Sequence, residues 1–289
     1  MKIYIIAIIP TLVICTNSGY SYAQSRNLPS KEQVVDKWYR QIRLLRSIDY
    51  KFSIKGDFSS GNIEIYNYHL RMNGDKYRLE VSFPPLSPLE QKKGFLTQSL
   101  STYDGKSFYG LKVSNGSANL DKSDKPTMRT SLGAMPIHIM PFSFAIDDLA
   151  ANYDPLHHLQ NPRTWARVKQ RIRKIEIGNH LNKPGFWLNM DGATTKQTVK
   201  VFVRIGDFYP IYSAVYENDK LTGEGDVETI SAGNVPLIIP RRIVIRGYFH
   251  GKSEEFFYVI DEHPKVNQKS NDTGIYSISR SQTTLYREK

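Results

Sequence analysis

The chain has 289 residues, of which 40% are hydrophobic and 23% charged, so it is not a disordered tail. Its single cysteine excludes an internal disulfide framework and any zinc site with two or more cysteine ligands. The excess of 39 Lys and Arg over 28 Asp and Glu gives a net charge of +11, which raises nucleic acid as a partner.

The first 23 residues have the pattern of a secretory signal peptide. Lys2 precedes an apolar run over 3–15, and Ser21-Tyr22-Ala23 ends in a small-x-small cleavage site. The run is shorter than the roughly 20 residues that span a bilayer, which disfavours a retained anchor. Lipidation of Cys15 is a second alternative, disfavoured because bulky Ile14 precedes the cysteine. We expect cleavage after Ala23 and export, to the periplasm or the extracellular space.

Removal of this leader changes the composition of the working protein. The only cysteine leaves with it, and the loss of Lys2 leaves 38 basic against 28 acidic residues, a net charge of +10. An exported chain without a recognisable binding module is not expected to bind nucleic acid. Its positive charge suits anionic envelope surfaces better.

Elements follow in chain order, beginning with a helix predicted over 31–46. Ser30 is a candidate N-cap, with Gln33 as its capping-box partner. An apolar stripe then recurs at helical spacing, formed by Val35, Trp38, Ile42 and Leu45. We expect this stripe to pack on a sheet.

From Asp49 onward the apolar period changes to two, which predicts strands with one buried and one solvent-facing side. The clearest examples are residues 76–83 and 199–205, where alternate residues are apolar. Tyrosine-rich runs at 63–72 and 254–260 are apolar on both sides. Turn dipeptides such as Asn73-Gly74 and Asp104-Gly105 recur at intervals typical of an antiparallel meander.

Residues 133–173 interrupt the strands. An apolar segment bounded by Pro136 and Pro141 continues with helical spacing to residue 150, and Asn161-Pro162 has the form of an N-cap followed by N1. Two helical pieces are therefore predicted between two halves of a sheet. No linker divides the chain, so residues 24–289 are predicted to form one domain.

The predicted fold class is mainly β (α+β): a curved antiparallel sheet, or incomplete β-barrel, with an N-terminal helix and an inserted helical lid. A long antiparallel sheet twists and curls, which gives it a concave apolar face. That face can enclose a cavity for an apolar ligand or be filled by the helices, and the sequence leaves both open.

Several segments resemble the periplasmic lipoprotein-carrier superfamily, the LolA/LolB-like fold. They are the opening helix with Trp38, the strand at 77–81, the hairpin Tyr103-Asp104-Gly105-Lys106-Ser107-Phe108-Tyr109, and the strand Pro210–Tyr216 with its turn at Asn218-Asp219. Over most of 30–260 the order of elements is similar. The resemblance implies a periplasmic binder of lipid or lipoprotein acyl chains, with outer-membrane lipoprotein sorting as its specific role. We also expect the protein to be a non-enzymatic monomer with envelope membrane proteins as further partners.

The expected ligand-binding residues line the apolar cavity. They are Leu79, Val81, Phe83, Val201 and Val203 on strands, and Met140 and Phe142 on the lid. A basic run around Trp165 is the expected contact with anionic surfaces, formed by Arg163, Arg167, Lys169 and Arg171. The alternative for this run is a solvated helix face followed by a protected strand edge.

No catalytic residue, metal or cofactor is expected. Asp154, His157 and His158 are the densest group of possible metal ligands, but adjacent histidines on a loop usually point apart. No nucleophile elbow, zinc-protease, P-loop or dinucleotide motif occurs. The alternatives to a carrier are a sensor or scaffold module of the same fold, a carbohydrate- or peptide-binding β-sandwich, and an envelope hydrolase.

Overall fold

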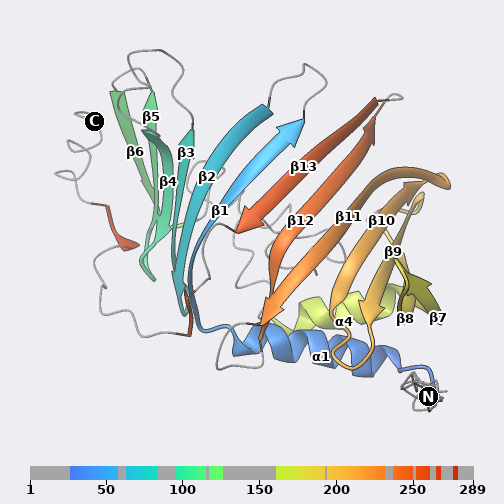
Figure 1. Ribbon diagram of the computed structural model, residues 1–289. Coiled ribbons are helices and arrows are strands. Elements are labelled where there is room, and N and C mark those ends of the chain that lie inside the picture. Colours follow the sequence, from blue (N-terminus) through green and yellow to red (C-terminus); the bar gives the residue numbers. More distant parts are fainter. Residues whose placement is uncertain are drawn as a thin grey trace, which may run out of the picture.

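The structure, a computed structural model, describes residues 27–57, 63–83, 96–114, 117–125, 161–192, 194–231, 237–249, 252–260, 265–267 and 276–278. Within these ranges the chain forms two helices and fourteen strands, the strands antiparallel to their neighbours (Figure 1). Residues 136–150, where the first half of the lid was predicted, lie outside them.

Six consecutive strands form an N-terminal meander. They are β1 (Ser47–Asp57), β2 (Ile63–Asn73), β3 (Lys76–Phe83), β4 (Leu96–Tyr103), β5 (Phe108–Ser114) and β6 (Ser117–Ser123). Gly74 and Gly105 have positive φ, as hairpin turns require, so the turns predicted at Asn73-Gly74 and Asp104-Gly105 are confirmed.

Seven more strands form a C-terminal meander. They are β7 (Ile172–His180), β8 (Lys183–Asp191), β9 (Gln197–Arg204), β10 (Pro210–Glu217), β11 (Lys220–Ser231), β12 (Ile238–Phe249) and β13 (Lys252–Ile260). A two-residue strand, β14 (Lys265–Val266), pairs with β1.

The two meanders join along one seam, where β1 pairs with β13 and Phe52 lies opposite Ile260. The sheet order is β6-β5-β4-β3-β2-β1-β13-β12-β11-β10-β9-β8-β7. Within the described part of the chain, the two end strands of this order, β6 and β7, do not pair with each other, so the sheet stays open. The predicted fold class, mainly β with an incomplete barrel, is confirmed.

The first helix, α1 (Lys31–Leu44), begins where the sequence predicts. The Ser30 side chain accepts a hydrogen bond from the Gln33 backbone, and the Gln33 side chain accepts one from the Ser30 backbone. This capping box satisfies two amides at the helix N-terminus. The predicted stripe of Val35, Trp38, Ile42 and Leu45 is buried.

The second helix, α4 (Pro162–Arg171), is capped by the Asn161 side chain, which accepts from the Arg163 amide. It lies beside α1 under the C-terminal meander (Figure 1). The Tyr39 and Trp165 rings meet between the helices with centroids 6.0 Å apart. This half of the predicted helical insert is confirmed.

The sheet has two different faces. We call the face on which α1 and α4 pack the inner face, and the opposite face the outer face. The main core joins both helices to the inner face and includes alternate residues of β1, β3, β8 and β9. A second, smaller cluster of buried residues lies on the N-terminal meander. It joins residues of β4, β5 and β6 to a residue near the C-terminus, and its members are Leu100, Tyr109, Leu111, Ala118 and Ile278.

Two residues near β9 differ from the predicted alternation. Phe202, predicted on the solvent-facing side, is fully buried, because aromatic side chains of neighbouring strands pack around it. Ile205, predicted on the apolar side, lies just beyond the end of β9 and is 45% exposed. In the described residues no helix is both long and apolar enough to cross a membrane.

Candidate functional site

Four of the predicted cavity residues lie on the inner face, fully or almost fully buried. Leu79 and Val81 come from β3, and Val201 and Val203 from β9. These strands belong to different meanders, yet all four side chains are part of one continuous core, because the sheet curves around the helices. Of Phe83 only the position at the end of β3 is described, and Met140 and Phe142 lie outside the described residues.

Helix α1 is fixed to this face through Trp38. Its indole Nε1 donates a hydrogen bond of 2.6 Å to the backbone oxygen of Phe208, in the turn between β9 and β10. Phe208 has φ of +54°, which is unusual for a bulky residue. The turn is held in this conformation by Asp207, whose carboxylate accepts from the Tyr209 amide and pairs with Arg204 at 2.6 Å. The anchor of α1 therefore rests on a well-supported turn.

Burial on the inner face falls along the strands with distance from the helices. On β7, Ile172 next to α4 is fully buried, Ile175 is half-buried and Ile177 is 62% exposed. On β12, Ile239 and Ile243 are buried, whereas Ile245 is half-buried.

The same gradient occurs on strands in the middle of the C-terminal meander and on β2. On β10, Ile211 is buried and Val215 half-buried. On β2, Leu70 is buried and Tyr68 half-buried. Among the described elements, the helices lie at one end of the inner face (Figure 1). Half-buried apolar side chains continue that face beyond the helices.

One polar group interrupts this apolar wall. Ser213 lies on β10 directly opposite Val201, with 3% of its surface exposed. Among the described residues, its hydroxyl has no hydrogen-bond partner. A buried hydroxyl without a partner costs free energy.

The four predicted anionic-contact residues have different surroundings. The Arg171 guanidinium donates two hydrogen bonds to the Asp191 backbone oxygen, at 2.8 and 2.6 Å, and so joins α4 to the end of β8. Lys169 lies 3.6 Å from Glu32 of α1. Arg163 and Arg167 are exposed. The contact with anionic surfaces stays a prediction, centred on these last two side chains.

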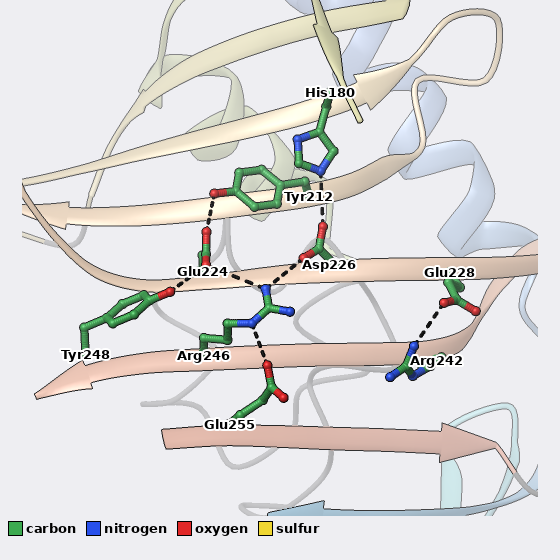
Figure 2. A network of polar contacts seen from close by, with 9 residues as sticks. All are labelled: His180, Tyr212, Glu224, Asp226, Glu228, Arg242, Arg246, Tyr248 and Glu255. Atoms are coloured by element: carbon green, nitrogen blue, oxygen red, sulfur yellow. Dashed lines mark hydrogen bonds and ion pairs between the residues drawn. The ribbon is translucent and has the colours of Figure 1, made fainter. Parts of the chain in front are cut away.

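The outer face of the C-terminal meander carries a polar network that the sequence analysis did not anticipate (Figure 2). Arg246 pairs with Glu255 at 2.6 Å and with Asp226 at 3.1 Å. Asp226 also contacts the His180 imidazole at 3.1 Å. Alternation along each strand indicates which side chains face outward, but only the register between strands brings these four together.

Glu224 is the second centre of this network. Tyr212 and Tyr248 each donate a hydroxyl hydrogen bond of 2.6 Å to its carboxylate (Figure 2). Burial alone would raise the pKa of Glu224, but these two hydrogen bonds and the Arg246 guanidinium outweigh it and lower that pKa. Burial and the hydrogen bond to Glu224 raise the pKa of Tyr212. Glu224 is thus held charged and Tyr212 neutral at ordinary pH.

An aromatic cluster adjoins the network. The His180 ring stacks against Tyr212 with centroids 4.3 Å apart, and Trp187 meets Phe202 edge-on at 4.9 Å. The aromatic rings pack against one another, and the polar groups of the network hydrogen-bond or pair with one another. In the described residues no group of three or more His, Cys, Asp or Glu side chains could hold a metal ion, and Asp154, His157 and His158 lie outside those residues.

The chain was compared with solved structures. A LolA superfamily protein from Nitrosomonas europaea matches with a TM-score of 0.47 and 10% identity, over 86% of this chain and 98% of its own. The chain is structurally similar to LolA superfamily proteins.

Two further solved structures are similar. A domain assigned to outer membrane lipoprotein sorting from Vibrio parahaemolyticus has a TM-score of 0.48 and 7% identity, over 89% of this chain and 100% of its own. A DUF1329 family protein from Desulfovibrio piger has a TM-score of 0.44 and 9% identity, over 88% and 99%. No family model and no curated protein sequence matches the chain.

Proposed function

We propose that the protein is an exported, non-enzymatic carrier that binds the acyl chains of a lipid or lipoprotein on its inner face. The observation that carries this proposal is the gradient of burial along the inner face. Ile175, Val215 and Ile245 extend the apolar surface beyond the described helices while keeping part of their area accessible. An acyl chain on that surface would be removed from water at about 0.8 kcal/mol per CH₂ group.

The polar groups of the site fit such a ligand. The Ser213 hydroxyl, which is buried beside Val201 and has no hydrogen-bond partner among the described residues, would donate a hydrogen bond to an ester or carboxylate oxygen of a ligand that opens the packing around it. Arg163 and Arg167 on α4 offer positive charge to an anionic headgroup or to the membrane surface from which a lipid is taken. The predicted leader would place this binding in the periplasm, where envelope membrane proteins would deliver and receive the cargo, with outer-membrane lipoprotein sorting as the specific role.

The experiment measures displacement of a dansyl-labelled fatty acid from the mature protein by saturated fatty acids of increasing length. If the chain is buried on the inner face, affinity should rise about fourfold per added CH₂, which is the equivalent of about 0.8 kcal/mol. Native mass spectrometry of the protein purified from bacteria should also show bound lipid. Absence of both uptake and co-purifying lipid would overturn the carrier proposal.

A matched pair of variants locates the binding surface. Val215→Asp places a charge on the inner face, and we expect it to weaken fatty-acid binding at least tenfold. Tyr216→Asp changes the next residue of β10, which is equally half-buried but faces outward, and should leave binding unchanged. Equal effects of the two variants would place binding elsewhere.

A second candidate function follows from the four predicted wall residues. Leu79, Val81, Val201 and Val203 are 0–7% exposed and pack within a core that includes α1 and α4. A filled interior favours a sensor or scaffold module that binds protein partners instead of lipid. Normal folding without lipid uptake in the displacement experiment is the result that this alternative expects.

A further inference from the structure

The free edge of β7 has the properties of an interface with a second copy of this chain. β7 is the last strand of the sheet order and pairs only with β8 among the described strands (Figure 1). An unpaired strand edge presents backbone N–H and C=O groups that can hydrogen-bond to another strand. Natural sheets usually protect such an edge with charges, a proline or a bulge.

Charged side chains that keep other strands from pairing with the β7 edge occur only in the first half of the strand. Arg173 and Lys174 are there, with 70% and 67% of their side chains exposed. Beyond Glu176 the strand carries Ile177, which is 62% exposed, and then Gly178 and Asn179, with no lysine, arginine or proline. An exposed isoleucine on an open strand edge is a feature that a partner strand would bury.

The charges of β7 are self-complementary in one antiparallel register. Placing Ile175 opposite Ile175 of the second copy puts Lys174 opposite Glu176, twice by symmetry, on the outer face. The same register puts Ile177 opposite Arg173, which lies where the register of β7 against β8 shifts. Centring the pair on Glu176 instead would place two carboxylates opposite each other, and centring it on Ile177 would form no ion pair.

We propose that two copies of the protein associate antiparallel through their β7 edges, about a two-fold axis at Ile175. The surface is isologous, as expected of a closed dimer, because each copy contributes the same residues. Opposite charges directly across an antiparallel pair stabilise it, and like charges destabilise it. The ion pair of 2.8 Å between Lys174 and Glu176 within each chain is then exchanged for one between the chains, so that two pairs within the copies become two pairs between them. This association departs from the monomer expected from the sequence and does not depend on lipid binding.

The test is sedimentation equilibrium of the mature protein over a range of concentrations. We expect the weight-average mass to rise from one chain toward two. Lys174→Glu and Glu176→Lys should each weaken self-association at least tenfold, because each converts two attractive pairs into two repulsive ones. The two side chains are 67% and 44% exposed, so circular dichroism should show the fold unchanged.

Mixing the two single variants is the decisive measurement. One copy then carries two glutamates and the other two lysines at these positions, so both pairs are attractive again, and the mixture should form heterodimers. Glu228→Lys is the control, because it makes the same charge change on the outer face of β11, away from the edge. A monomer at all concentrations, a dimer that neither variant weakens, or a mixture that stays monomeric would overturn the proposal.

Discussion

Two glycines explain how large aromatic side chains fit on the outer face at β7 and β8. Gly178 and Gly185 lie directly opposite each other in the pair of strands. A Cβ atom at Gly178 would overlap the Trp187 ring, and one at Gly185 would overlap both the Phe202 ring and the Val203 backbone oxygen. The missing side chains therefore create the space that the aromatic rings occupy.

Substitution of these glycines by alanine should destabilise the protein. We expect Gly185→Ala to lower the free energy of unfolding by about 1–3 kcal/mol, the usual cost of overpacking, and by more than Gly178→Ala, because backbone cannot move aside as a side chain can. Urea unfolding followed by tryptophan fluorescence measures the difference. Gly223→Ala is the matched control, because its nearest neighbour, the Arg246 backbone oxygen, would lie at an ordinary contact distance of 3.5 Å. Equal stability of all three variants would contradict this account.

The same residues show what alternation in a sequence can and cannot predict. Val201 and Val203 were correctly assigned to the buried side of β9, because a two-residue period fixes which side chains share a face. Phe202 was assigned to the solvent-facing side, where it does point, but it is buried. Its cover comes from Trp187 and His180 on other strands, and no local pattern contains that information.

At the scale of elements, both described helices begin where the sequence predicts. Their signals are local: Ser30 with Gln33 for α1, and Asn161 with Pro162 for α4. The pairing of β1 with β13 could not be predicted, since neither strand carries a motif that selects the other. The outer-face network depends on such registers, and the sequence analysis therefore missed it.

The network at Glu224 joins β10, β11 and β12 through side chains and should make stability depend on pH. The pKa of Glu224 is lower in the folded protein than its ordinary value of 4.5. A carboxylate of this kind contributes stability above its unfolded pKa, and that contribution is lost as the pH falls through the folded pKa. Burial raises the pKa of Glu80, but the Arg78 and Arg71 guanidinium groups outweigh burial and lower that pKa. Glu80 therefore also stabilises the fold above its unfolded pKa and loses that contribution in acid.

We expect Glu224→Gln to be clearly less stable than the wild type at pH 7 and to approach it as the pH falls below about 4.5. Urea unfolding at a series of pH values measures the difference. Glu217→Gln, which removes an exposed carboxylate from the end of β10, controls for the loss of one charge. A constant difference between Glu224→Gln and the wild type across this range would show that the carboxylate is not responsible.

At the scale of the whole molecule, one asparagine joins distant parts of the chain. The Asn267 side chain accepts hydrogen bonds from the Arg46 and Ser47 amides at 2.8 and 3.2 Å, and donates one of 2.7 Å to the Leu44 backbone oxygen. It thereby connects the end of α1 to the start of β1 from a position more than two hundred residues later in the sequence. Its φ of +53° is one that asparagine tolerates well.

Asn267→Gly should lower the free energy of unfolding by about 2 kcal/mol, because it removes three hydrogen bonds worth about 0.5–1.5 kcal/mol each and tolerates the same backbone conformation. Asn267→Ala should cost more, since alanine is also strained at positive φ. Urea unfolding of the two variants separates these contributions. A glycine variant as stable as the wild type would refute a role for the side chain.

Part of the inner face was predictable from the sequence, but its extent was not. Alternation identified Leu79, Val81, Val201 and Val203 as inward-facing, and the structure places all four in one core. Which end of the inner face the helices cover depends on tertiary packing, such as the bond between Trp38 and the Phe208 carbonyl. The half-buried surface around Val215 and Ile245 was therefore beyond the reach of the sequence.

The seam between β1 and β13 also sets an order of events during synthesis. Each meander consists of neighbouring strands and can form as soon as its own residues are available, but Phe52 must wait for Ile260. Contacts between such distant residues form slowly, because a long loop must close first. A chain cut short before residue 252 would keep the N-terminal meander and β7 to β12 but lose β13, which leaves β1 and β12 with open edges and makes premature termination an aggregation hazard for this protein.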